Sequence, residues 1–197
     1  MKKVLMSALI VASFFGAKAQ SGTVLVGGDV DFSSNKVENS DVKSHSISFN
    51  PYVGYQFNDN WTAGITAALN SSKNENGIND SKNNSFAAGP FIRYTKPLSN
   101  IFAVYGQLQG VYGGYKSKLT SGNVTTTTAE GNTLGVNLFP AVFINLKNSF
   151  GLNFNVGGIS YNNNDPKSGP GNNSFNINFG KTVSIGLSKN FGGKKKA

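Results

Sequence analysis

The chain has 197 residues, of which only 14% are charged, against about 25% in ordinary soluble domains. It contains no cysteine, which excludes disulfides and cysteine-dependent chemistry. The formal net charge is +9, but six of the 18 basic residues lie at the two ends, in Lys2, Lys3, Lys18 and Lys194–Lys196. The remaining 12 basic residues face nine acidic ones, so the body carries only +3. Nucleic acid is therefore not an expected partner.

Residues 1–19 have the pattern of a secretory signal peptide. Lys2 and Lys3 precede an apolar run, and Ala17 and Ala19 supply small residues at the −3 and −1 positions of a cleavage site. We therefore expect the mature chain to begin near Gln20. The apolar run is shorter than the roughly 20 residues that a membrane-spanning helix needs, and no later segment qualifies. A helical membrane protein is excluded.

Eight runs of alternating apolar and polar residues follow the predicted signal peptide. Alternation with period two indicates strands with one apolar and one polar face, and its recurrence around short turns predicts antiparallel hairpins. The sequence therefore predicts an all-β fold, an eight-stranded antiparallel up-and-down transmembrane β-barrel over residues 20–191, with a basic tail at 192–197. The runs lie at 23–33, 45–57, 61–71, 85–95, 101–116, 133–146, 150–161 and 174–191.

The polar faces of these runs consist mostly of Gly, Ser, Thr, Asn and Gln. Small uncharged residues suit the lumen of a membrane barrel, whereas a soluble barrel needs an apolar interior and a charged exterior. We therefore expect the apolar face to contact lipid. Prolines 51, 90 and 140 lie on that face, and because proline removes a ladder donor we expect them at bulges or strand starts.

The predicted connections alternate in length. Short turns at 58–60, 96–100 and 147–149 alternate with polar segments at 34–44, 72–84, 117–132 and 162–173, which predicts short periplasmic turns and long extracellular loops. Aromatic residues near the strand ends predict two interfacial girdles. The periplasmic girdle would contain Phe57, Trp61, Tyr94, Phe102, Phe150 and Phe191, and the outer one Phe32, Phe49, Phe86, Tyr112, Tyr161 and Phe175.

The signal peptide, the eight runs and the segments PYVGYQFNDNWTAG and VSIGLSKNF resemble the outer-membrane β-barrel domain family of Gram-negative bacteria, the eight-stranded group that includes OmpX, OmpW and the OmpA membrane domain. The resemblance implies a location in the cell outer membrane, contact with outer-membrane lipids and lipopolysaccharide, and insertion by the barrel-assembly machinery. Phe191 and Gly186 match the terminal signal that this machinery recognises. Lys189, two residues before Phe191, stands where the family usually has an apolar residue. An extracellular partner at the long loops is a further expectation.

Few residues offer chemistry. His45 is the only histidine, and the resemblance to lipid A deacylases, which place a His-x-Ser arrangement on one strand face, fails because Ile47 takes the serine position and Ser46 points to the other face. We therefore expect no catalytic residue and no cofactor, and a lipid-modifying enzyme is the third hypothesis. Calcium on oxygen ligands from Glu75, Asp80 and Asp165 is an alternative to the expectation of no metal site.

The inward phase of the strands carries Asp29, Asp31 and Arg93. Buried charges persist when they are paired, so we expect an internal ion-pair network. An eight-stranded barrel is narrow enough for side chains to fill, and the inward residues that would help to plug it are Tyr52, Phe91, Tyr105, Gln107, Gln109, Phe139 and Phe143. The preferred function is a structural or surface-interaction barrel with a plugged lumen. The alternative is a narrow channel or transporter for small or apolar solutes, with the charges as its constriction.

Overall fold

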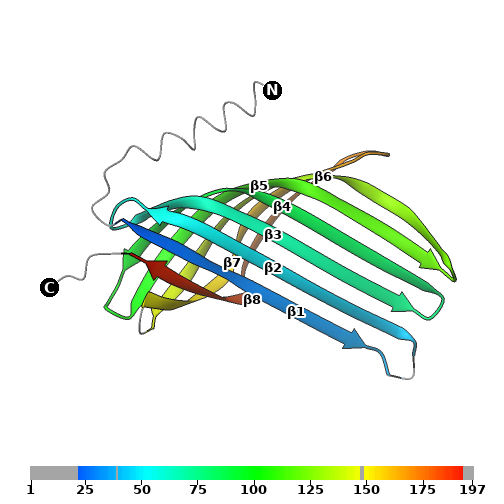
Figure 1. Ribbon diagram of the computed structural model, residues 1–197, viewed down its shortest axis with the longest axis horizontal. Helices are drawn as coiled ribbons and strands as arrows, with labels where there is room; N and C mark the ends of the chain where they lie inside the picture. Colours follow the sequence, from blue (N-terminus) through cyan, green and yellow to red (C-terminus); the bar gives the residue numbers. More distant parts are fainter. Residues whose placement is uncertain (1–21, 39, 147–148, 193–197) are drawn as a thin grey trace.

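The structure is a computed structural model that describes residues 22–38, 40–146 and 149–192. The predicted signal peptide and residues 193–197 of the predicted tail lie outside the described residues. The described chain forms eight strands (Figure 1). They are β1 (Thr23–Lys36), β2 (Val42–Gln56), β3 (Trp61–Asn76), β4 (Asn79–Pro97), β5 (Phe102–Ser121), β6 (Val124–Asn145), β7 (Phe150–Pro166) and β8 (Asn172–Phe191).

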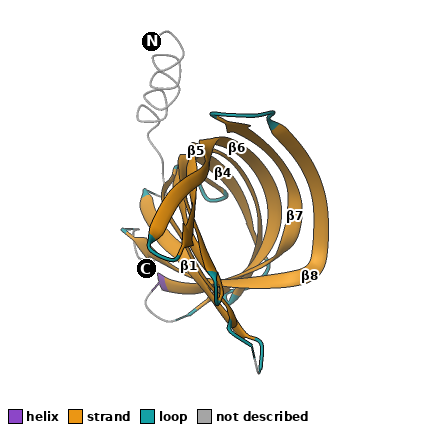
Figure 2. Cartoon of the chain, turned by 90° about the vertical axis from the view of Figure 1, so that its right-hand side faces the viewer, coloured by secondary structure: helices purple, strands orange, loops and turns teal. Residues whose placement is uncertain are grey.

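Each strand pairs antiparallel with the next, and β1 pairs with β8, so the sheet closes into a barrel (Figure 2). The predicted all-β, eight-stranded, up-and-down architecture is thus confirmed. Within the described residues, no helix is long and apolar enough to span a bilayer.

The predicted short turns at 58–60 and 96–100 are confirmed at one end of the barrel, where backbone hydrogen bonds join Phe57 to Trp61 at 3.1 Å and Leu98 to Phe102 at 2.9 Å. Residues 147–148 of the third predicted turn lie outside the described residues, but the flanking Leu146 and Phe150 are joined by a backbone hydrogen bond of 2.7 Å. The first turn is also ordered by the Asn58 side chain, whose Oδ1 accepts from the backbone of Asn60 and Trp61. The ends of β1 and β8 lie at this same end of the barrel (Figure 1).

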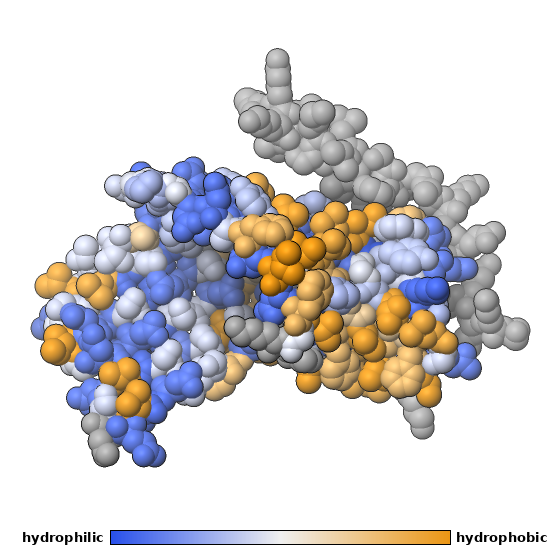
Figure 3. All heavy atoms as spheres, turned by 180° about the vertical axis from the view of Figure 1, so that it is seen from behind, coloured by the Kyte–Doolittle hydropathy of each residue, from blue (hydrophilic) through white to orange (hydrophobic). Residues whose placement is uncertain are grey.

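The apolar phase points outward as predicted. Ile65 is 52% exposed and Ile185 56%, whereas their inward neighbours Thr66 and Ser184 line the lumen. The apolar side chains gather around the part of the barrel that adjoins the short turns, and hydrophilic residues cover the opposite end (Figure 3). This distribution is what a barrel needs when lipid surrounds only part of its height.

The prediction of four long loops is wrong, because most residues of these segments extend the strands. The segments are 34–44, 72–84, 117–132 and 162–173. β6 has 22 residues, about twice the 9–11 that cross a bilayer. The hairpin ends are tight: Gly77 and Gly122, with φ of +80° and +58°, turn β3 into β4 and β5 into β6. These extensions could not be predicted from the sequence, because both faces of the strands are polar there and apolar and polar residues do not alternate.

Prolines 51, 90 and 140 lie inside strands, where the pairing with one neighbouring strand is interrupted. Pro51 has no partner on β3, Pro90 none on β5 and Pro140 none on β7, although each is paired on its other side. Only the interruption at Pro140 is accompanied by a register shift, between Leu138 and Ala141. The prediction of bulges or strand starts therefore holds for that proline alone.

The seam of the barrel is short. β1 and β8 pair from Val24 and Phe191 to Asp29 and Gly186, so the outer part of β1 pairs only with β2. β8 diverges from β1 where the register between β7 and β8 shifts, between Asn155 and Gly157 of β7. At this place in β8, Gly180 has a φ of +73°. This bend carries the outer part of the β7–β8 hairpin away from β1.

Candidate functional site in the lumen

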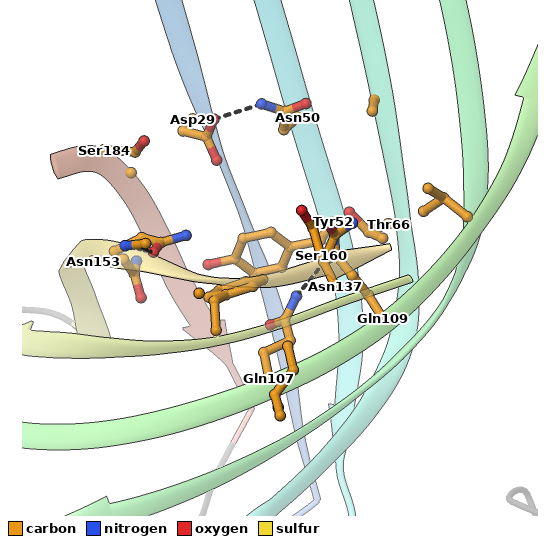
Figure 4. Close-up of a pocket in the computed structure, with 18 of the residues that line it drawn as sticks. Asp29, Asn50, Tyr52, Thr66, Gln107, Gln109, Asn137, Asn153, Ser160 and Ser184 are labelled. Carbon is orange, nitrogen blue, oxygen red and sulfur yellow. Dashed lines mark hydrogen bonds between the residues drawn. The ribbon is translucent and has the colours of Figure 1, made fainter. Parts of the chain in front are cut away.

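The barrel encloses a cavity of about 740 Å³ that residues from all eight strands line. Most of the lining side chains are amides, hydroxyls or carboxylates, and those labelled in Figure 4 project from opposite walls into the shared space. The cavity extends from Arg93 and Tyr105, near the short turns, to Asp31 and Asn176 nearer the outer end. We call this space the cup, and the layer around Arg93 its floor.

Arg93 is the centre of the floor and is only 4% exposed. The register places it beside Thr62 on β3 and Gln107 on β5, one residue away from the ring pair of Trp61 and Tyr94. Its Nε donates to Gln107 Oε1 at 2.8 Å. Gln107 in turn donates from Nε2 to Gln109 Oε1 at 2.8 Å, so a chain of hydrogen bonds fixes the guanidinium from the β5 side.

Three aromatic rings surround the guanidinium. The Arg93 Cζ atom lies 4.1 Å from the ring centroid of Tyr105, 4.8 Å from that of Tyr52 and 5.7 Å from that of Phe91. Tyr52 and Phe91 also meet edge to face, with centroids 5.9 Å apart. Cation–π contacts of this kind contribute about 0.5–2 kcal/mol each, more when desolvated. The rings therefore hold the buried cation in place and fill the lumen around it.

The predicted ion-pair network of Asp29, Asp31 and Arg93 is wrong. None of the ion pairs among the described residues includes any of the three side chains. Asp29 instead accepts a hydrogen bond from Asn50 Nδ2 at 2.7 Å (Figure 4), and its place on β1 is one inward position beyond the Tyr52 layer. Sequence phase identified the inward residues correctly but not their contacts, which depend on distances across the lumen.

The inward aromatic and amide residues behave as predicted. Phe91, Tyr105 and Gln107 are buried, Gln109 and Phe139 line the cup, and Phe143 lies against Gly151, where a Cβ atom would collide with its ring. The sequence did not single out the pair of Asn153 and Ser188, both buried, which are joined by a hydrogen bond of 2.9 Å between β7 and β8. Their inward phase was the available signal.

Two buried polar atoms at the cup have no hydrogen-bond partner among the described residues. They are the hydroxyl of Tyr52 and the Oδ1 atom of Asn153, whose Nδ2 is the atom bonded to Ser188. The Tyr52 hydroxyl lies over Gly27, where an added Cβ would come within 2.5 Å of it. An unmade hydrogen bond at a buried group costs about 1–3 kcal/mol, so a polar group that reached either atom from the cup would be stabilised there.

At the outer end, ion pairs join the strand extensions. Lys73 binds both Glu75 and Asp80, the latter at 2.9 Å, and Glu130 binds Lys167 at 2.8 Å and Lys116 at 3.3 Å. Hydrogen bonds from Lys167 and Lys116 lower the pKa of Glu130, and those to Glu75 and Asp80 raise the pKa of Lys73. The pairs are exposed and of modest strength, but they connect β3 to β4 and β5 to the end of β7.

The proposed calcium ligands are not brought together. Glu75 and Asp80 face each other across β3 and β4 and share the Lys73 ammonium, while Asp165 lies on β7 opposite Asn132. In the described part of the chain, no three acidic or histidine side chains are grouped in a way that could hold a metal ion.

His45 lies in the outer part of β2 and is exposed. Its Nδ1 is 3.0 Å from the hydroxyl of Ser34 on β1. Ser46 falls in the opposite phase, in register with Ser33 and Ser72. The histidine is thus an exposed side chain near the strand end and lies apart from the cup.

The predicted girdle residues are exposed at both levels except Phe57, which is half-buried. At the level of the short turns, Trp61 and Tyr94 pack edge to face with centroids 5.0 Å apart. Lys189, which departs from the usual terminal pattern, places its Nζ 4.4 Å from the ring centroid of Phe150 and 5.1 Å from that of Phe191. The outer-level rings are Phe32, Phe49, Phe86, Tyr112, Tyr161 and Phe175, all at least 41% exposed.

Comparisons with known proteins bear on this arrangement. The sequence matches the family described as "Outer membrane protein beta-barrel domain" over residues 6–191, whereas no curated protein sequence matches. Among solved structures, the chain is similar to the attachment invasion locus protein Ail of Yersinia pestis, at 16% identity and a TM-score of 0.41 over 87% of this chain and 99% of Ail. It is similar to Neisserial surface protein A at 15% identity and a TM-score of 0.41, over 88% of this chain and 98% of that protein. It is also similar to OprG from Pseudomonas aeruginosa at 15% identity and a TM-score of 0.37, over 88% of this chain and 97% of OprG.

Proposed function

Since the chain belongs to the outer membrane protein β-barrel domain family and resides in the cell outer membrane, we propose that it is a barrel with a closed lumen and a structural or surface-interaction role. Outer-membrane lipids and lipopolysaccharide contact its apolar band in this proposal, and the barrel-assembly machinery inserts it. The extended strands and their ion-paired ends form the surface offered to an extracellular partner.

One observation carries this proposal: the buried Arg93 and its rings occupy the lumen near the short turns. Arg93, Phe91, Tyr105 and Gln107 are each at most 7% exposed. Three rings enclose the buried guanidinium and Gln107 fixes it. Side chains rather than solvent therefore fill the lumen at this level. Above this floor the cup is wide, so the barrel is closed on one side only.

Planar-bilayer recording tests the closed floor. We expect the wild-type protein to show no steady conductance, and the double substitution Arg93→Ala and Tyr105→Ala to create conducting events. Asn137→Ala, which changes the cup wall above the floor, is the matched control and is expected to stay silent.

A narrow channel or transporter is the second candidate, and the size of the cup together with its carboxylates Asp29 and Asp31 favours it. Steady conductance of the wild-type protein that disappears in Asp29→Asn or Arg93→Gln would replace the closed-lumen proposal with this one. A lipid-modifying role has no comparable support, since His45 and Ser46 fall in opposite phases on β2.

A further inference from the structure

The cup carries fixed charges of opposite sign at different heights. Arg93 lies at the floor, and Asp29 and Asp31 lie above it on β1. Two residues of a strand advance by about 7 Å, so Asp29 is one such step above the layer of Tyr52 and Asp31 is two. We propose that the cup binds small zwitterionic solutes, with the anionic group at Arg93 and the ammonium group at Asp29 and Asp31.

Part of the Arg93 side chain has no partner in the described part of the chain. Its Nε donates to Gln107, and aromatic rings lie close to its Cζ atom. The two Nη nitrogens have no hydrogen-bond or ion-pair partner among the described residues. A buried cation without an anion is costly, and a guanidinium edge suits a carboxylate, which can accept two parallel hydrogen bonds.

The two carboxylates of the cup have oxygens without a partner among the residues that the structure describes. Asn50 donates to one oxygen of Asp29, and the other oxygen points into the cup (Figure 4). Asp31 has no hydrogen-bond or ion-pair partner within the described part of the chain. An ammonium group brings three donors, which matches carboxylate oxygens that the protein leaves unused.

Two further polar atoms in the wall of the cup have no partner among the described residues. The Tyr52 hydroxyl can donate to an anionic group beside Arg93, and Asn153 Oδ1, on a side chain only 6% exposed, can only accept. A ligand with both an acceptor and a donor end satisfies both atoms. A simple anion would leave Asn153 unsatisfied and meet the repulsion of Asp29 and Asp31, and a simple cation would meet that of Arg93.

The inference rests on the closed floor of the proposed function, because an open pore would expose Arg93 to water and ions from both sides. The test uses the full mature chain folded in detergent micelles and isothermal titration calorimetry. The probes are glycine, γ-aminobutyrate and ε-aminocaproate, which differ in the separation of their two charges. Caproate and hexylamine each carry only one of these charges and serve as controls.

We expect at least one zwitterion to bind about tenfold more tightly than caproate or hexylamine, the ratio that one charge-assisted contact supplies. Asp29→Asn and Asp31→Asn should each remove most of that preference. Asp41→Asn removes a carboxylate outside the cup and should change nothing. Arg93→Gln should abolish the preference, and the aspartate variants decide the matter if this variant does not fold.

The inference would be overturned if none of the three zwitterions bound more tightly than caproate and hexylamine. Unchanged binding in both aspartate variants would also overturn it. These outcomes are independent of conductance. A wild-type protein that conducts but still prefers zwitterions would contradict only the closed-lumen function, and a silent barrel without that preference would contradict only the binding site.

Discussion

Single residues on the outer face report which solvent surrounds the barrel. Ile65 and Ile185 lie in the apolar part of β3 and β8, are more than half exposed and belong to the apolar phase. We expect Ile65→Arg or Ile185→Arg to lower the free energy of unfolding by about 2–4 kcal/mol, since an arginine near the bilayer midplane must leave water. Denaturant titration of the protein refolded into lipid vesicles measures the change.

The control for these substitutions must face the cup. Asn137 lines the cavity and is partly exposed, so Asn137→Arg should cost less. Gln107 is inward too, but its oxygen accepts from Arg93, and a second guanidinium there would meet the first. Equal sensitivity of Asn137 and Ile65 would show that lipid does not contact the face carrying Ile65.

At the scale of strands, the seam between β1 and β8 makes a sharp prediction. Leu25 and Asn190 are in register, whereas Asp31 and Ser184 would be in register only if the pairing continued beyond Asp29. A disulfide needs Cα atoms within about 7 Å. We expect Leu25→Cys with Asn190→Cys to cross-link on oxidation and Asp31→Cys with Ser184→Cys to remain reduced, as read from gel mobility.

Asp31→Cys with Ser48→Cys is the positive control at the same height, because β1 and β2 are paired there. It should cross-link as fast as the Leu25 pair. A rapid cross-link between positions 31 and 184 would mean that the seam is closed along its whole length and that the outer edge of β1 is not free.

The strand extensions should depend on pH through Glu130. Its pKa is lowered from the ordinary 4.5 by hydrogen bonds from Lys167 and Lys116. A lowered pKa means that the carboxylate stabilises the folded state above pH 4.5 and that this contribution is lost as the pH falls through the lowered value. We therefore expect faster amide exchange at the outer ends of β5, β6 and β7 in acid, after correction for intrinsic exchange rates.

Glu130→Gln should show the same faster exchange already at neutral pH and should respond less to acid. Glu75→Gln changes the other ion-paired hairpin, β3–β4, and should leave the β5–β7 ends unaffected. If acid loosened these ends equally in Glu130→Gln and in the wild type, other groups would be responsible.

The strands also show what the sequence could and could not predict. Where apolar and polar residues alternate, as from Leu134 to Ile144, the sequence located the strand and its two faces. Where both faces are polar, as in the paired Ser72 and Asn83 or Thr120 and Thr125, no contrast remained and strands were predicted as loops. The aromatic surroundings of Arg93 and the early end of the β1–β8 ladder depend on three-dimensional distances and bends, which a period of two does not encode.

At the scale of the whole molecule, the chain carries its own depth marker. Trp61 is the only tryptophan, is 37% exposed and packs on Tyr94 at the periplasmic girdle. Indole rings favour the headgroup level. In vesicles of brominated lipids, we expect its fluorescence to be quenched more by bromines near the glycerol end of the acyl chains than by bromines at the methyl end.

A second reporter fixes the other boundary of the band. Trp61→Phe combined with Tyr112→Trp moves the indole to an exposed site on β5 at the outer girdle, and the same depth preference should return. Lys116→Trp, also on the Trp61→Phe background, moves it farther along the same outward face of β5 into the polar extension, and quenching should fall sharply because those residues stand above the lipid. If a tryptophan at position 116 were quenched as strongly as one at 112, the hydrocarbon would cover the extended strands, and the height of the barrel above the membrane would have to be redrawn.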